Sequence, residues 1–220
     1  MNSFDYLKKI CNLETNEYVI ANTLKKYEED LQAWKKIIAN LKYIFVGDNP
    51  GDVEKERKEY FCYDGNKSSQ TGINTHNFIE NFLKLKKDEI LFLNKSLKPT
   101  TSTEELYVCS PLEDKSLVLT AQLIQAVADE NTNVFVCIFG LDSFKAEYFE
   151  SFFNNLSLDE NIGLYPHPSR RQPISIKEQE NFANGYDKQK VFRIYGQLRY
   201  SNETKSLIER CEEEYKKSKK

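Results

Sequence analysis

The chain has 220 residues, of which 40% are hydrophobic and 30% are charged, and its formal net charge is −3 at pH 7. This length suffices for one sizeable core, so we expect a single domain over residues 1–220, and the composition excludes a disordered or fibrous protein. A weakly acidic chain has no overall electrostatic footprint for nucleic acid, so any contact with DNA or RNA requires a local basic patch.

The first part of the chain, about residues 1–40, is predicted to be helical. Apolar side chains recur there at helical spacing and charged residues fill the other face; the apolar positions are Leu24, Tyr27, Leu31, Trp34, Ile37 and Ile38. Such a pattern is typical of amphipathic helices that bury one face.

Four short apolar runs follow and are predicted to be strands, at residues 43–46, 90–93, 134–139 and 162–165. Their apolar residues are nearly continuous, which is typical of parallel strands covered on both faces. Helical stretches are predicted between them at 74–84, from 103 or 117 to 129, and at 143–155, and a charged helix is predicted from residue 203. We expect an α/β fold, a three-layer α/β/α sandwich with a central, mainly parallel, four-stranded sheet, interrupted by an irregular insertion at 172–190.

Polar motifs follow three of these strands. GDNPG follows the first, NKSLKPT the second and HPSRR the fourth. Ligands bind open parallel sheets outside the carboxyl ends of the strands, so we expect the three motifs to meet at one edge.

In GDNPG, Asp48 and Asn49 are short polar side chains that could position or activate a water molecule at this edge. Gly51 permits close approach of a ligand. The alternative is a plain strand-to-helix turn in which Asn49 or Asp52 caps a helix, and for this motif alone we favour that alternative.

In HPSRR, His167 stands between two prolines that hold it in an extended, rigid frame. A rigid histidine at a strand end can donate a hydrogen bond to a developing oxyanion, or act as an acid or base. Ser169, Arg170 and Arg171 suit contacts with phosphate. The alternative is a His-Pro turn with two solvated arginines.

Two further side chains suit a flat, amide-like ligand. Asn94 ends the apolar run ILFLN and presents both a donor and an acceptor, and Phe61 offers an aromatic ring for stacking. The alternatives are that Asn94 satisfies the loop backbone and that Phe61 packs in the core, which is the commoner position of phenylalanine. His76, in GINTHNF, is interpreted as a structural or surface residue.

In chain order, these motifs resemble those of the uracil-DNA glycosylase superfamily. GDNPG resembles the G-x-N-P-G of its mismatch-specific and single-strand-selective branches, and GDNPGDVEKERKEYFCYDG is similar to the thermophile-type branch, where acidic residues, an aromatic and a glycine follow the first motif. Asn94 matches the strand-end asparagine that reads uracil, and HPSRR matches the H-P-S motif. The resemblance covers about residues 43–171.

The resemblance implies a role for each matching residue. Asn49 would hold the water that attacks the sugar C1′, and Asp48 would share that task. His167 would stabilise the negative charge that grows on the departing base. The base would be bound by Gly47, Phe61 and Asn94, with Phe61 stacking and Asn94 reading the amide edge; the DNA backbone would be gripped by Ser169, Arg170 and Arg171.

The function that the resemblance implies is a monofunctional DNA glycosylase, a hydrolase that excises uracil or a related deaminated base in base excision repair. Two alternatives remain: a catalytically inactive module that binds a base or a nucleic-acid end, and an unrelated flavodoxin-like domain that binds a small nucleotide. The partner is expected to be DNA that contains a damaged base.

No cofactor and no metal are expected. The five cysteines include no CxxC pair, and the cysteines of the thermophile-type iron–sulfur cluster are missing. The longest apolar runs are too short to span a bilayer, and the N-terminus has no signal-peptide pattern. We therefore expect a cytoplasmic monomer that does not enter membranes, with most of its cysteines buried as thiols.

Overall fold

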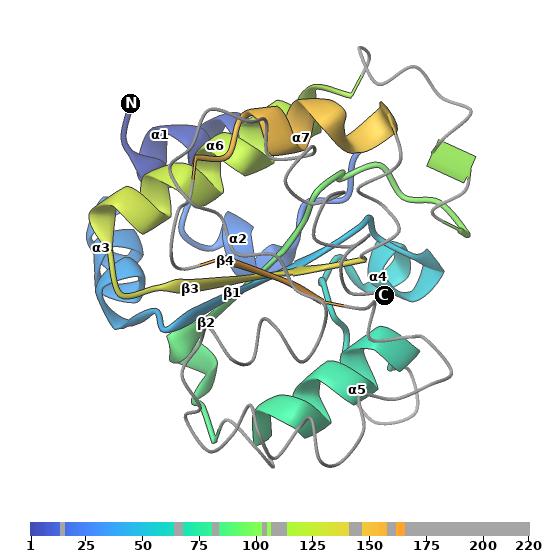
Figure 1. The fold of residues 1–220 in the computed structure, drawn as a ribbon, viewed down its shortest axis with the longest axis horizontal. Helices are drawn as coiled ribbons and strands as arrows, with labels where there is room; N and C mark the ends of the chain where they lie inside the picture. Colours follow the sequence, from blue (N-terminus) through green and yellow to red (C-terminus); the bar gives the residue numbers. More distant parts are fainter. Residues whose placement is uncertain are drawn as a thin grey trace, which may run out of the picture.

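The computed structural model describes residues 1–13, 16–63, 68–80, 84–102, 105–106, 114–140, 147–157 and 162–165. Helices and strands alternate along these residues (Figure 1). The strands are β1 (Tyr43–Gly47), β2 (Ile90–Asn94), β3 (Phe135–Phe139) and β4 (Ile162–Tyr165). The α-helices are α1 (Ser3–Cys11), α2 (Asn22–Lys25), α3 (Leu31–Asn40), α4 (Asp52–Arg57), α5 (Gln70–Phe78), α6 (Lys115–Glu130) and α7 (Glu150–Asn154), and short 3-10 helices precede β2 and α7, η3 (Lys87–Glu89) and η7 (Glu147–Phe149).

The strands form an open parallel sheet in the order β2-β1-β3-β4. The α/β class and the parallel pairing are confirmed, and each predicted strand lies within one residue of an observed one. The chain passes from β1 to β2 on one side and then to β3 on the other, so the direction of the crossovers reverses at β1. The crevice beside the carboxyl ends of β1 and β3 is therefore the topological switch point, where sheets of this kind bind ligands.

The prediction of helix throughout residues 1–40 is wrong in its middle part. The segment contains α1, α2 and α3, but residues 18–21 are not helical. All four side chains of this YVIA stretch are buried, whereas an amphipathic helix would bury only one face. The Val19 N–H donates to the Leu97 carbonyl (2.8 Å), so the stretch is held against the loop after β2 instead of bonding to itself.

The other helices differ from their predicted bounds mainly at the N-termini, except that α5 also ends early, at Phe78 and not at residue 84. Helix α6 begins at Lys115, near the later of the two predicted starts, because Asp114 caps it by accepting from the Ser116 N–H (3.0 Å). Helix α5 begins before residue 74, because the Ser69 hydroxyl accepts from the Gly72 N–H (2.9 Å). Of the helix predicted at 143–155, η7 and α7 lie in the described part. The predictions for residues 172–190 and beyond 203 lie outside it.

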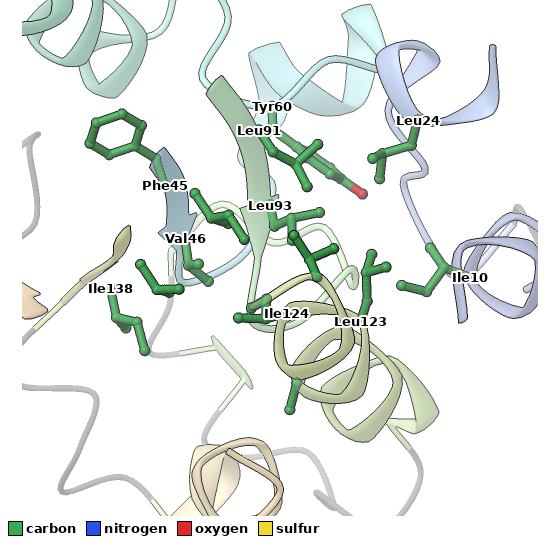
Figure 2. Packing of buried hydrophobic residues seen from close by; sticks show 14 of the residues in the cluster. Ile10, Leu24, Phe45, Val46, Tyr60, Leu91, Leu93, Leu123, Ile124 and Ile138 are labelled. Carbon is green, nitrogen blue, oxygen red and sulfur yellow. The ribbon is translucent and has the colours of Figure 1, made fainter. Parts of the chain in front are cut away.

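Helices α1, α6 and α7 lie on one side of the sheet and α5 on the other (Figure 1). Figure 2 shows Leu123 and Ile124 of α6 beside Leu93 of β2, and all three side chains are fully buried. Burial of such a side chain contributes about 1.5–3 kcal/mol. The packing of α6 against the sheet fixes the strands in place. The residues that follow the strands are therefore held by a rigid scaffold.

Three cysteines of the described part, Cys11, Cys62 and Cys137, are buried free thiols, as expected. Among the helices that the structure describes, none is both long and apolar enough to cross a membrane.

Candidate functional site

The loops that follow β1 and β2 stay paired beyond the ends of the strands. The Lys95 N–H donates to the Gly47 carbonyl (2.9 Å), and the Ser96 N–H donates to the Asp48 carbonyl (3.0 Å). The register also places Gly47 opposite Asn94. The GDNPG and NKSLKPT motifs therefore meet at one edge of the sheet, as predicted.

Gly47, Phe61 and Asn94 form a group on the β2 side of β1, which we call the amide cluster. Asn94 is 2% exposed, and its Oδ1 lies so close to Gly47 that a Cβ atom there would overlap it. The same Cβ would lie 3.3 Å from Cζ of Phe61. Gly47 thus allows an amide and a ring to approach the backbone together.

The amide nitrogen of Asn94 is buried, and no hydrogen-bond partner for it is found in the described part of the chain. Buried polar groups in native proteins are nearly always paired, and an unpaired donor costs about 1–3 kcal/mol. The sequence-based alternative, in which Asn94 satisfies the loop backbone, leaves this nitrogen unexplained. A ligand that accepts a hydrogen bond would explain it.

Phe61 is 1% exposed and packs in the core, so the core interpretation of this residue is confirmed for the free protein. Its ring stacks on Phe92, with centroids 5.1 Å apart and planes at 30°. Its backbone has φ of 51°, a left-handed conformation that is uncommon for a bulky residue and often marks a functional site. The edge of the ring still borders Gly47, so core packing and contact with a ligand at that position are compatible.

Glu54, from α4, joins the first motif to Phe61. Its carboxylate accepts hydrogen bonds from the N–H groups of Gly51 (3.1 Å) and Phe61 (2.5 Å). Burial raises the pKa of Glu54 from its ordinary 4.5 to about 7, although both hydrogen bonds act in the opposite direction. Sequence reasoning missed this role, because Glu54 lies in an acidic run that resembles a solvated helix face.

Asp48, Lys95 and Gly140 form a second group at the switch point between β1 and β3, which we call the charged cluster. The ammonium group of Lys95 is fully buried, forms an ion pair with Oδ1 of Asp48 and donates to the Phe139 carbonyl (2.7 Å). It also lies over the ring of Phe149, 5.0 Å from the centroid. Lys95 was not predicted as a site residue from the sequence. Its position directly after a buried strand could have indicated such a role.

Gly140 supports the Asp48 carboxylate from the β3 side. Its φ is 87°, and a Cβ there would lie 2.5 Å from Oδ1 and 2.6 Å from Oδ2 of Asp48. Only glycine adopts this conformation freely and leaves room for the carboxylate. The carboxylate is therefore confined between Lys95 and the backbone of β3.

Asn49 is half-buried, and its amide nitrogen donates to the Thr100 hydroxyl (2.7 Å) and the Pro50 carbonyl (3.2 Å). The bond to Thr100 ties the GDNPG loop to the loop after β2, whereas the bond to Pro50 lies within the motif. A helix does follow the motif, but its N-cap is Gly51, so the alternative in which Asn49 or Asp52 caps the helix is wrong.

Asp114 is a second buried aspartate near this edge, and its surroundings differ from those of Asp48. It accepts from the hydroxyls of Ser96 (2.5 Å), Ser116 (2.5 Å) and Tyr148 (2.6 Å). These neutral donors and its capping bond satisfy the carboxylate, so Asp114 is an anchor for α6 and the loop after β2.

The predicted site residues His167, Ser169, Arg170 and Arg171 lie outside the described residues, so their place at this edge stays a prediction. β4 ends at Tyr165, which pairs with Phe139 at the carboxyl end of β3. His76, the other histidine, stacks on Tyr63 with centroids 4.8 Å apart, and burial lowers its pKa.

Within the described ranges, no three His, Cys, Asp or Glu side chains come together in a way that could hold a metal ion. No protein-family model matches the chain, and no curated protein is significantly similar to it.

Proposed function

We propose that the protein is a monofunctional DNA glycosylase that hydrolyses the N-glycosidic bond of uracil or a related deaminated base. The observation that carries this proposal is the amide nitrogen of Asn94, a buried donor without a partner in the described chain, beside Gly47 and the ring of Phe61. A donor and an acceptor on one amide, next to an aromatic ring, suit the edge of a pyrimidine that presents a carbonyl and an N–H.

The same residues favour a flipped base over a base within a duplex. Asn94 is only 2% exposed and stands at the end of a buried strand, so a stacked base could not reach it. Enzymes that act on a base in DNA extrude it from the helix, and stacking and hydrogen bonds to the base edge within the enzyme replace those of the helix.

Hydrolysis requires a water molecule to attack C1′ while the bond from C1′ to the base nitrogen breaks. The electron pair of that bond leaves with the base. Asp48 and Asn49 are proposed to hold the water, and His167 to donate a hydrogen bond to the departing anion. A water-excluding site strengthens that last interaction.

The proposal also includes the layered arrangement of the fold, the contact with DNA, the localisation and the oligomeric state. We propose a three-layer α/β/α sandwich, in agreement with the helices seen on both sides of the sheet. Arg170 and Arg171 would supply the local positive charge that the net charge of −3 lacks, and the Ser169 hydroxyl would donate to phosphate. The protein is proposed to act as a cytoplasmic monomer.

One observation favours the second candidate, an inactive module that binds a base or a nucleic-acid end. Both groups proposed to hold the water already have partners in the free protein, since Asp48 is paired with Lys95 and the amide nitrogen of Asn49 bonds to Thr100. Such a module would keep the amide cluster and lose the reaction.

The test uses a labelled oligonucleotide with a single uracil, in single- and double-stranded form, followed by alkaline cleavage of abasic sites. We expect cleavage by the wild-type protein that is lost in His167→Ala. Absence of cleavage by folded protein at low salt, with hypoxanthine and xanthine also tried, would contradict the glycosylase. Binding of uracil-containing DNA under those conditions would then support the inactive module.

A further inference from the structure

Lys95 is a fully buried cation with no role in the reaction outlined above. We infer that Lys95 is a positioning residue that fixes Asp48 as the group that accepts a proton from the attacking water. This inference rests on the proposed glycosylase function. It also separates the roles of Asp48 and Asn49, which both stand in the first motif.

The contacts of Lys95 leave its ammonium group little freedom. It is held by the Asp48 carboxylate on one side and by the Phe139 carbonyl (2.7 Å) on another, and it lies over the rings of Phe149 (5.0 Å) and Phe153 (5.7 Å). The contacts come from the ends of β1 and β3 and from the helices after β3. Lys95 therefore connects the three elements that border the switch point.

An ion pair is an expensive way to bury an aspartate. Removing two charges from water costs several kcal/mol for each ion, and an apolar pair of similar volume is often as stable or more stable. Asp114 shows that this same edge can bury an aspartate with neutral hydroxyl and N–H donors alone. An aspartate at this edge can therefore be buried without an ion pair. This indicates that the charge of Lys95 has a function besides allowing the burial of Asp48.

The placement of Asp48 fits that use. Its Oδ1 is bound by Lys95, and the backbone of Gly140 confines both oxygens, so the carboxylate has one orientation. The Asp48 side chain keeps 9% of its surface exposed, whereas that of Lys95 keeps none. A carboxylate can therefore meet water at the edge of the sheet while its cation stays beneath it.

Asn49 cannot take the same role, because an amide does not accept a proton at neutral pH. Its amide nitrogen also serves the loop, as a donor to Thr100 and Pro50. Asn49 is suited to orienting the water or the loop, and Asp48 to removing the proton.

In the reaction, the water oxygen forms the new bond to C1′ and one of its protons passes to Asp48. The bond from C1′ to the base nitrogen breaks and its electron pair leaves with the base, which later takes up a proton from solvent, while Asp48 releases its own proton to solvent and becomes a carboxylate again. Lys95 makes no covalent bond. Its charge balances that of Asp48 until the proton arrives, and no further reactant is needed.

The experiment compares wild type with Lys95→Met, Asp48→Asn and the double variant, by single-turnover excision from a uracil oligonucleotide, affinity for that oligonucleotide and thermal unfolding. Lys95→Met keeps the length of the side chain and removes its charge. The double variant leaves no unpaired charge, so its fold is expected to recover toward wild type. Lys35→Met is the matched control, the same change at an exposed position of α3, the helix that precedes the amino end of β1.

We expect each single variant to lose excision rate on the order of 10²–10⁴-fold, the usual range for a general base, with the affinity for DNA nearly unchanged. The double variant should regain its unfolding temperature but not its rate, and Lys35→Met should match wild type. A purely structural role of the Asp48–Lys95 pair predicts instead that the double variant regains both, and a structural role of Lys95 alone predicts a wild-type rate in folded Lys95→Met.

The outcomes distinguish this inference from the proposed function. If the wild type excises uracil and the double variant regains a wild-type rate, the positioning role of Lys95 is wrong and the glycosylase stands. If Lys95→Met keeps a wild-type rate, the inference fails in the same way. If the folded wild type excises no base, the proposed function fails, and the reaction role of Lys95 falls with it.

Discussion

Polar groups are buried on both sides of β1 at the same edge of the sheet, but they are paired on one side and not on the other. On the β2 side, the amide cluster contains a buried nitrogen of Asn94 that lacks a partner in the described chain. On the β3 side, the charged cluster contains a cation and a carboxylate, Lys95 and Asp48, that satisfy each other. Gly47 and Asp48 are neighbours in sequence, yet they belong to different sides.

This difference separates a buried donor that has no partner in the described chain from a carboxylate that is already paired. An unpaired buried donor costs free energy in the free protein and regains it when an acceptor arrives. A paired charge costs free energy through desolvation but holds its geometry before any ligand binds. The amide cluster is therefore suited to recognition and the charged cluster to chemistry.

The largest expected effect comes from breaking the charged cluster at Gly140. Gly140→Ala places a Cβ 2.5 Å from Oδ1 of Asp48, at a residue whose φ is 87°. Backbone strain and overpacking together should lower the free energy of unfolding by about 4 kcal/mol, as measured by urea denaturation.

Gly51→Ala is the matched control for this change, because a Cβ at Gly51 meets nothing within 4 Å. It removes a glycine from a helix N-cap and should cost less than about 1 kcal/mol. Equal losses in the two alanine variants would show that Asp48 is not confined as described.

An intermediate effect is expected from Glu54, which holds Phe61 in the amide cluster. Its pKa rises from 4.5 in the unfolded chain to about 7 in the folded protein, so the folded state binds more protons between these values. The contribution of Glu54 to the free energy of unfolding should therefore be largest below pH 4.5 and fall by about 3 kcal/mol as the pH rises to 7.

The variant Glu54→Gln mimics the protonated acid and should flatten this dependence, measured as the urea midpoint against pH. Glu56→Gln, at an exposed position of the same helix, is the control and should follow the wild-type curve. An unchanged slope in Glu54→Gln would mean that another group titrates in this range.

The smallest effect on stability is expected where the amide cluster loses its unpaired donor. Asn94→Leu has a similar shape and removes the buried nitrogen, so the free energy of unfolding should stay equal or rise by about 1 kcal/mol. Binding of a uracil oligonucleotide, followed by fluorescence anisotropy, should weaken at the same time. A clear loss of stability would instead show that the Asn94 amide has a structural partner.

The strands were predictable because each is a continuous apolar run. Such a run can be identified without knowing which other segments pair with it. Helix starts were less predictable. The α5 and α6 caps depend on Ser69 and Asp114, which were not distinguishable from other polar loop residues. The prediction of helix failed at residues 18–21, because the backbone of this stretch bonds to a partner far away in sequence, the carbonyl of Leu97.

The alternation of strands and helices, the parallel sheet and the meeting of the first two polar motifs could all be predicted, since they follow from local hydrophobic patterns and from the geometry of parallel strands. The pairing of the polar side chains could not be predicted in this way. Lys95 reaches Asp48 and Phe139 across β1, and Glu54 reaches Phe61 across a loop, over distances in sequence that no local pattern encodes. Burial and pairing are properties of the assembled edge, and they separate Asn94, whose amide nitrogen lacks a described partner, from Asp48, which has one.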